Sequence, residues 1–330
     1  MQMVYNVSMI KLEISANEGN QRLDRFLKKY YRNAPLSYIY KLLRTGVKVN
    51  GRRVAQNTRL AAGDLLTIDI SEEEEKAYLA REKPGTIKRQ FQIAYEDENL
   101  LVVEKPFGLL THGTMEEGRE TLANQVLGYL MDSGAYRPEQ EKTFVPSPVN
   151  RLDRNTTGLV IFGKNAEALR SLSRMLRERG CISKYYLTVV HGEMREAMIL
   201  RGRMEKDTAA NKVEIRGSET AAGKIMETRA RPLKTSKGFT IVEVELITGR
   251  THQIRAQLAK AGYPVVGDRK YGDPKVNAKM GRDYSLKAQF LHASRLVFEN
   301  CLPPLEYMNN KELRSQLPQQ LRNIETGLFT

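Results

Sequence analysis

Hydrophobic residues recur with two different periods in the first seventy positions of the chain. Over residues 9–14 and 66–70, apolar and polar side chains alternate, which is typical of half-buried strands. Over residues 23–31 and 37–45 the apolar side chains have helical spacing instead. Asn50-Gly51 is a strong signal for a hairpin turn. This part of the chain therefore predicts two short helices beside paired strands.

The alternation stops in a charged segment. This segment contains the acidic run Glu72–Glu75 and the tripeptide Lys83-Pro84-Gly85, with few apolar residues around them. Such a composition is typical of a linker, which can include a short solvated helix. We therefore expect a first domain over residues 1–71 and a linker over residues 72–90.

The rest of the chain predicts a larger second domain over residues 91–305 and a tail over residues 306–330. Residues 200–240 predict only an irregular antiparallel stretch. The clearest elements are strands at 100–103, 159–162, 184–190 and 241–246, helices at 165–179 and around Leu258, and a polar C-terminal helix at 311–325.

The charge of the chain favours a polyanionic partner. The sequence has 53 Lys and Arg against 39 Asp and Glu, a formal net charge of +14. Residues 1–70 hold 12 of these basic residues and 5 of the acidic ones, so half of the net charge lies in about a fifth of the length. Nucleic acid is the commonest partner of such a basic region, although a merely solvated basic face is the alternative. The phosphate-contact candidates on the second helix and the hairpin are Lys41, Arg44, Lys48 and Arg52.

A compact polar segment precedes the most apolar predicted strand. Arg151, Asp153 and Arg154 stand shortly before Leu159–Phe162. The strand requires a packed core, whereas the three charged groups require solvent or a charged ligand, so we expect them on a loop at the edge of a sheet. Positive charge on both sides of a carboxylate favours its ionised form and attracts an anionic backbone. The alternative is a surface loop with local arginine–aspartate pairs, which contribute little to stability.

The same segment closely resembles the R-L-D-x-x-T-[ST]-G motif of the RluA-type pseudouridine synthases, which are RNA-modifying enzymes. The matching residues are Arg151, Leu152, Asp153, Thr156 and Gly158, while Asn150 stands where most of the family has histidine. The resemblance implies that Asp153 is the catalytic aspartate and that Arg151 fills the gap left by a flipped nucleotide. It also implies that Thr156 and Gly158 help to bind the substrate. Arg154, which flanks the carboxylate, is a further substrate-binding candidate because of its charge.

Further segments are similar to other motifs of this family. Glu104–Leu109 resembles the first motif. Thr248–Arg255, followed after a short helix by Pro264–Asp268, resembles the third almost letter for letter. The resemblance makes Arg255 the partner of the catalytic aspartate, with Arg250 and His252 as secondary candidates.

Two strands carry the remaining family segments. Lys184-Tyr185-Tyr186 is similar to the K-x-Y segment, and Phe290–Ala293 is similar to the closing strand. By the same resemblance, Tyr186 stacks on the target base and Leu291 helps to form the base pocket. A tyrosine in a strand can equally be an ordinary core residue.

The basic first domain resembles an S4 RNA-binding domain, which often precedes the catalytic domain in this family. The resemblance rests on Arg22–Leu27, Ser37–Val49, Asn50-Gly51 and Gly63-Asp64. The fold it implies is α+β: a small S4-like RNA-binding domain followed by a pseudouridine synthase catalytic domain with a mixed, largely antiparallel sheet.

Other chemistries lack their signatures in this sequence. The four histidines and two cysteines have no zinc-ligand spacing, and there is neither a P-loop nor a G-x-S-x-G segment. A metal-dependent nuclease needs several converging carboxylates, whereas the loop offers only Asp153. We therefore expect no metal and no cofactor. The remaining alternatives are a non-catalytic RNA-binding protein and an RNA glycosidase-like hydrolase that releases uracil.

RNA is the expected partner, and the resemblance favours large-subunit ribosomal RNA over transfer RNA. No association with a membrane is expected. Cys181 and Cys301 are too few for a disulfide framework. The sequence also shows no secretory signal and no apolar run long enough to span a bilayer. We therefore expect a cytoplasmic protein, and a monomer.

Overall fold

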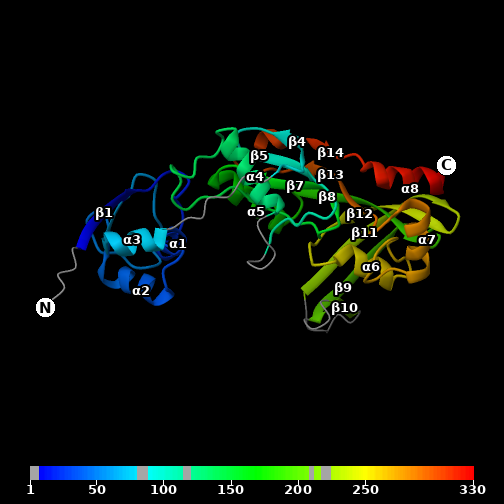
Figure 1. The fold of residues 1–330 in the computed structure, drawn as a ribbon, viewed down its shortest axis with the longest axis horizontal. Coiled ribbons are helices and arrows are strands. Elements are labelled where there is room, and N and C mark those ends of the chain that lie inside the picture. The colour runs from blue at the N-terminus through cyan, green and yellow to red at the C-terminus, as the bar shows by residue number, and fades with distance from the viewer. Residues whose placement is uncertain (1–6, 80–87, 114–119, 208–211, 217–223) are drawn as a thin grey trace.

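The computed structural model describes residues 7–79, 88–113, 120–207, 212–216 and 224–330. A small module lies at one end of an elongated molecule, and a large sheet with its helices forms the rest (Figure 1). The two units have separate apolar cores, one formed by residues up to Leu79 and the other by residues from Phe91 onwards.

The N-terminal module consists of a three-stranded antiparallel sheet covered by helices. Its strands have the order β1-β3-β2, and the apolar residues that alternate in sequence point into one core. Its elements are β1 (Val7–Glu13), α1 (Leu23–Tyr30), α2 (Leu36–Thr45), β2 (Val47–Val49), β3 (Leu65–Ser71) and α3 (Glu72–Leu79). The two predicted helices and the paired strands are confirmed.

Helix α3 belongs physically to this module, although its residues were expected to form a solvated linker helix. The rings of Tyr78 and Tyr38 lie 4.8 Å apart, and the Tyr38 hydroxyl donates a hydrogen bond of 2.9 Å to Glu74. The acidic side chains hide this attachment in the sequence, since only the last two residues of the helix pack on the core.

The larger unit is built on one eleven-stranded sheet. The strand order is β10-β9-β11-β12-β8-β13-β7-β5-β4, with β14 paired to β13 and β6 paired to β7. Neighbours are antiparallel except β13 and β7, which confirms the predicted mixed, largely antiparallel sheet. The strands are β4 (Gln92–Glu96), β5 (Leu100–Lys105), β6 (Ser147–Pro148), β7 (Thr157–Gly163), β8 (Ile182–His191), β9 (Met198–Asp207), β10 (Lys212–Arg216), β11 (Lys224–Ser236), β12 (Phe239–Leu246), β13 (Leu291–Phe298) and β14 (Glu312–Arg314).

Two sequence predictions for this unit are wrong in detail. Residues 200–240 were expected to be an irregular antiparallel stretch. The antiparallel pairing is confirmed, but β9 and β11 are long, regularly paired strands. Residues 208–211 and 217–223 of this range lie outside the described residues. The predicted helix at 311–325 begins later, because residues 312–314 pair with β13 before α8 starts.

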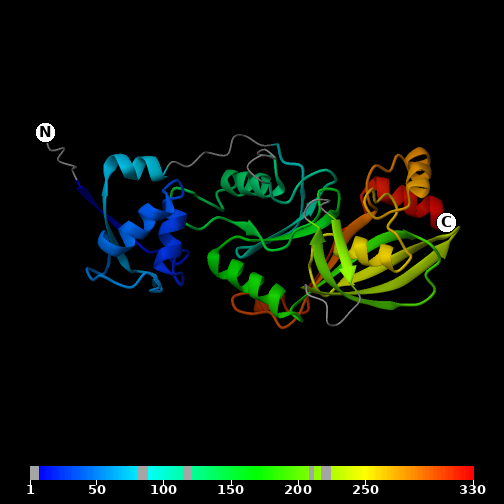
Figure 2. The same cartoon turned by 90° about the horizontal axis from the view of Figure 1, so that it is seen from below.

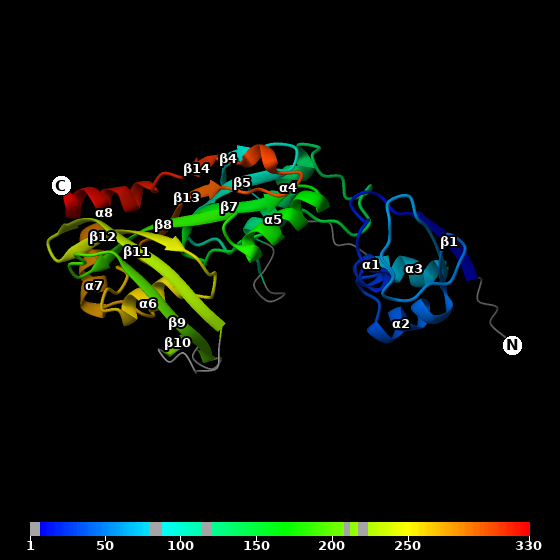
Figure 3. The ribbon, with the colours of Figure 1, turned by 180° about the vertical axis from the view of Figure 1, so that it is seen from behind.

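Helices cover both faces of the sheet (Figures 2 and 3). At β5 and β7, alternate residues pack against α4 on one face and α5 on the other. Helix α6 shares the core of α4, while α7 and α8 pack together around a separate core at β8 and β12. The helices are α4 (Leu122–Asp132), α5 (Ala166–Glu178), α6 (Gln253–Lys260), α7 (Pro274–Tyr284) and α8 (Gln319–Phe329), with a short 3-10 turn at Glu306–Met308.

Strand β7 fixes the position of the loop that precedes it. All of its residues are buried, and Gly158 has a φ of 103°. A Cβ atom at this position would lie 2.2 Å from the Ala293 carbonyl oxygen, so only glycine permits the close approach of β13. The loop at residues 150–156 therefore begins from a rigid, central strand.

Residues 17–19 connect the N-terminal module to the larger unit. Glu18 is fully buried and accepts a hydrogen bond of 2.8 Å from the Lys142 backbone N–H. Asn17 Oδ1 accepts one of 3.0 Å from the Ala166 backbone N–H, in the first turn of α5. The module therefore contacts the segment at Lys142 through a buried carboxylate, and the N-terminal end of α5 through the half-buried Asn17.

Candidate active site

A large pocket of about 1030 Å³ opens at the loop before β7. Among the described residues that line it, Asp153 is the only carboxylate. The basic residues that line it are Arg151, Arg154, Arg177, Arg179, Lys184, Arg250, Arg255 and Lys270. This arrangement attracts an anionic polymer and directs it to one acidic group.

Asp153 is held by Arg255, as the family resemblance implies. Arg255 Nη1 donates a hydrogen bond of 2.8 Å to Asp153 Oδ2. The same guanidinium donates through Nε and Nη2 to Asp268, at 2.6 and 2.8 Å. Asp268 is fully buried, whereas the Asp153 side chain is 28% exposed. One guanidinium thus joins a buried carboxylate to a carboxylate that faces the pocket.

The charges of this cluster compensate one another. Burial acts to lower the pKa of Arg255, but hydrogen bonds to Asp268 and the charges of Asp268 and Asp153 outweigh it and raise that pKa. Burial acts to raise the pKa of Asp268, yet Arg255 and the backbone N–H groups of Lys270 and Tyr271 lower it. Asp268 was not named as a site residue, although it ends the segment that resembles the third family motif.

His252 and Tyr271 form the other side of this cluster. His252 Nε2 lies 3.9 Å from Asp153 Oδ2, and its Nδ1 lies 3.2 Å from the Tyr271 hydroxyl. The Arg255 guanidinium carbon lies 5.5 Å from the centre of the Tyr271 ring. Burial lowers the pKa of His252 despite the charge of Asp153, so the neutral imidazole predominates at neutral pH.

The loop itself is fixed by neighbouring side chains. Thr111 Oγ1 accepts from the Leu152 backbone N–H at 3.1 Å and donates to the Leu152 carbonyl at 3.0 Å. The Thr156 N–H donates to the Asp153 carbonyl at 3.0 Å. Asn150, which replaces the usual histidine, accepts from the Ile161 N–H at 2.8 Å. These bonds hold the backbone on both sides of Asp153.

Tyr186 and Leu291 supply an apolar wall on adjacent strands. Tyr186 is 5% exposed and Leu291 is 4% exposed, and both line the pocket. Burial and the nearby Asp153 raise the pKa of the Tyr186 hydroxyl. A planar apolar ligand at this wall would lie beside the carboxylate.

Lys105 is a site residue whose importance the sequence did not show. It is 1% exposed at the end of β5, and its ammonium donates to the carbonyls of Pro106, Leu109 and Arg154 at 3.0, 2.8 and 2.8 Å. Burial lowers the pKa of Lys105 to about 7, against the opposing effect of Asp153. Three carbonyl acceptors require three N–H donors, so the geometry corresponds to the charged form. Its place in Glu104–Leu109, the segment that resembles the first family motif, was the available signal.

The structure brings together some of the predicted substrate-binding residues and separates others. Those that line the pocket are Arg151, Arg154, Thr156, Arg250, His252 and Leu291. Gly158 lies behind the loop, in contact with β13. The basic residues of the N-terminal module (Lys41, Arg44, Lys48 and Arg52) lie on α2, on β2 and at the adjacent turn, outside the pocket.

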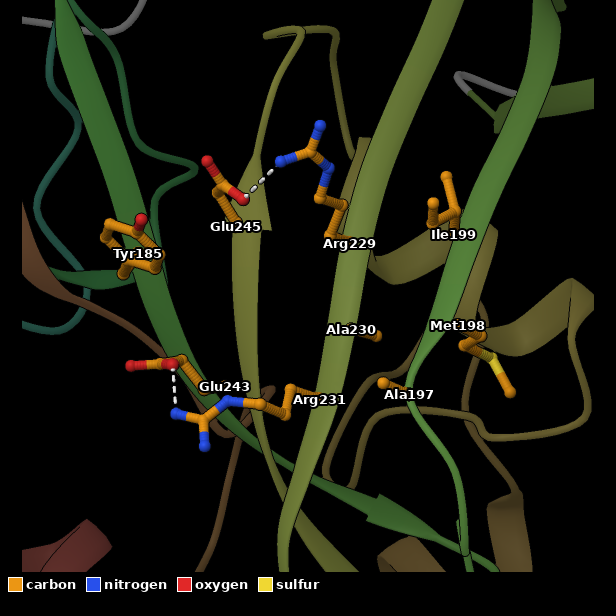
Figure 4. A pocket seen from close by; sticks show the side chains of 9 residues that line it. All are labelled: Tyr185, Ala197, Met198, Ile199, Arg229, Ala230, Arg231, Glu243 and Glu245. Carbon is orange, nitrogen blue, oxygen red and sulfur yellow. Dashed lines mark hydrogen bonds and ion pairs between the residues drawn. The ribbon is translucent and has the colours of Figure 1, made fainter.

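A second, smaller pocket of about 430 Å³ lies on the opposite face of β8 (Figure 4). Tyr185 faces it, whereas Lys184 and Tyr186 face the Asp153 pocket. Its charged side chains pair with one another: Arg229 with Glu245 at 3.2 Å, and Arg231 with Glu243 at 2.6 Å. It therefore lacks the uncompensated charge that distinguishes the Asp153 pocket.

Within the part of the chain that the structure describes, no three or more His, Cys, Asp or Glu side chains are grouped to hold a metal ion. In the same residues, no helix is both long and apolar enough to cross a bilayer.

The chain is similar to known proteins over most of its length. Residues 99–260 match the family model of RNA pseudouridylate synthase. The ribosomal large subunit pseudouridine synthase C of Vibrio vulnificus is 30% identical over 97% of this chain and 96% of its own. That of Escherichia coli K12 is 33% identical over 86% and 87%. The structure of human RNA pseudouridylate synthase domain containing 4 has a TM-score of 0.52 at 24% identity, covering 70% of this chain and 92% of its own, which shows a shared fold. The chain therefore belongs to the RNA pseudouridine synthase family.

Proposed function

We propose that this enzyme converts specific uridines of large-subunit ribosomal RNA to pseudouridine, with Asp153 as its catalytic residue. One observation carries the proposal: the only carboxylate among the described residues lining a basic pocket is fixed by Arg255 at 2.8 Å. The two relatives compared above are named for the large ribosomal subunit. The cytoplasmic location and the monomeric state expected from the sequence are part of this proposal.

The reaction needs no redox partner, because it is an isomerisation. The N1–C1′ glycosidic bond breaks, the uracil turns, and C5 joins C1′. The proton lost from C5 balances the proton gained at N1. Asp153 acts on the sugar, either as a nucleophile at C1′ or as a base at C2′. Both roles need a carboxylate that is oriented before the reaction starts, which the Arg255–Asp268 pair supplies.

The target base must leave its stack to reach Asp153, at a cost of roughly a few kcal/mol. Tyr186 and Leu291 form the apolar wall that receives the uracil, with stacking on the tyrosine ring worth about 1–3 kcal/mol. The exposed Arg151, two residues before Asp153, fills the gap in the RNA. Arg154, Thr156, Arg250 and His252 complete the substrate-binding surface of the pocket.

Mapping pseudouridines in the ribosomal and transfer RNA of cells with and without the gene tests the proposed substrate. We expect one or a few large-subunit positions to lose pseudouridine when the gene is deleted, and to regain it when the wild-type gene is restored. Loss confined to transfer RNA would contradict the assignment to ribosomal RNA. Release of free uracil from the purified protein and an RNA transcript would indicate hydrolysis instead of isomerisation.

The N-terminal module is proposed to be an S4-like domain that binds RNA phosphates. Lys41, Arg44 and Arg52 are exposed, and Lys48 is half-buried beside them. These side chains lie in α2, in β2 and in the turn that follows, on one small unit. Electrostatic contacts of this kind contribute affinity and register without contributing chemistry.

Reversing the charge of Lys41, Arg44 and Arg52 to glutamate should weaken RNA binding and flatten its dependence on salt. Each lost phosphate contact lowers the log–log salt slope by roughly 0.7–0.9, so three contacts lower it by about 2–3. The rate at saturating RNA should stay within about twofold, because none of these residues lines the pocket. Reversal of the exposed Lys275, Lys279 and Lys287 makes the same charge change elsewhere. Equal salt slopes for the two triple variants would show that the basic face of the N-terminal module is ordinary solvated surface and does not contact RNA phosphates.

A further inference from the structure

The C-terminal end of α5 returns to the Asp153 loop. Strand β7 leads away from the loop for seven residues, about 23 Å. Helix α5 follows it and has thirteen residues, about 20 Å. Since the helix packs back along β7, its last turn reaches the level of Asp153. Arg177 and Arg179 therefore line the same pocket as the carboxylate.

Three cations at this rim lack a carboxylate partner. Within the described ranges, no ion pair is formed by Arg177, Arg179 or Lys184. Arg174, one turn earlier, differs because it pairs with Glu178 at 2.7 Å. Lys184 is half-buried on β8, and burial together with the charge of Arg179 lowers the pKa of its amine. An anion at this place would compensate charges that the protein leaves uncompensated.

The backbone of Arg179 gives a second, independent observation. Arg179 has a φ of 66° and a ψ of 160°, a conformation that almost only glycine adopts. Complementing the helix dipole does not require this position, because a basic residue within the last turn is sufficient. Arg282 has such a position in α7. The strain at Arg179 indicates that its side chain serves the pocket.

We propose that Arg177, Arg179 and Lys184 form a phosphate-binding subsite for the RNA strand that carries the target uridine. This inference rests on the proposed function, since it assigns a place to the backbone of that substrate. Lys184 and Tyr186 point from the same face of β8, about 7 Å apart. A phosphate held by the three cations therefore lies next to the nucleotide whose base stacks on Tyr186.

The subsite also links the pocket to the N-terminal module. The first turn of α5 contacts that module through Ala166 and Asn17, at 3.0 Å, and Figure 3 shows α5 on the side of the larger unit that faces the module. A strand bound by both units can follow the exposed face of α5 from one to the other.

The double variant Arg177→Ala/Arg179→Gly tests the subsite with a labelled single-stranded RNA that contains uridine. Its log–log salt slope for binding should fall by about 1.4, since each cation contributes about 0.7 on a single strand, and affinity near physiological salt should fall about tenfold. KM should rise by a similar factor, with kcat within about twofold. The matched control Lys279→Ala/Arg282→Ala removes the same charge from exposed positions of α7. It should leave the salt slope, the RNA affinity and KM at their wild-type values.

The single variant Arg179→Gly separates binding from folding. Glycine accepts the Arg179 backbone conformation, so the melting temperature should stay equal or rise while RNA affinity falls. A salt slope equal to that of the α7 control, or an affinity loss accompanied by a lower melting temperature, would overturn the subsite. Binding is measured whether or not the uridine is converted. If the variants differ in salt slope but the protein modifies no ribosomal RNA, the phosphate-binding subsite is supported and the proposed function is contradicted.

Discussion

Asp153→Asn should reduce the single-turnover rate on a defined RNA by at least about 10⁴-fold, the upper range for one acid–base or nucleophilic group. No other carboxylate among the described pocket residues can replace it. Arg255 would keep both hydrogen bonds to Asp268, so the fold should be retained. RNA affinity should stay within about threefold, because the change affects one charge among many.

The control for this variant is Asp283→Asn, which removes an exposed carboxylate on α7. Pseudouridine in the transcript can be measured by chemical labelling, and affinity by titration at fixed salt. Conversion by Asp153→Asn within tenfold of the wild-type rate would remove Asp153 from the catalytic role.

The local parts of the site could be predicted from the sequence. The short apolar run after Arg151–Gly158 indicated a buried strand, and this predicted that the charged residues before it lie at a sheet edge. The predicted helix at 165–179 also forms as α5, and the Asn165 side chain caps it by accepting a hydrogen bond from the Ala168 N–H. These features are determined by residues that are close in sequence, so the local pattern of apolar and polar residues is sufficient to predict them.

The partners that the fold brings from elsewhere could not be predicted in this way. Lys105 lies 48 positions before Asp153 and reaches the loop only because β5 pairs with β7. The motif resemblance placed Asp268 in the same segment as Arg255, but only the folded chain shows that Arg255 donates hydrogen bonds to it. The regularity of β9 and β11 was not predicted, because charged residues interrupt the apolar residues along both strands.

Two replacements of Arg255 should distinguish its role in orienting the Asp153 carboxylate from its role in the stability of the fold. Arg255→Ala leaves Asp268 fully buried without its partner, and loss of one member of a buried pair costs about 3–5 kcal/mol of unfolding free energy. Its activity loss would therefore combine a weakened fold with a misplaced Asp153. Urea denaturation should show the stability loss directly.

Arg255→Lys is the decisive variant. A lysine retains a positive charge beside Asp268, but its single ammonium cannot reproduce a rigid fork that donates twice to Asp268 and once to Asp153. We expect kcat to fall about 10²-fold, the usual effect of a small misplacement of a reacting group, with KM within about threefold and most of the stability retained. Arg250→Lys is the control, because Arg250 lines the same pocket and is exposed. Near wild-type kcat for Arg255→Lys, with a large loss for Arg250→Lys, would transfer the orienting role to Arg250.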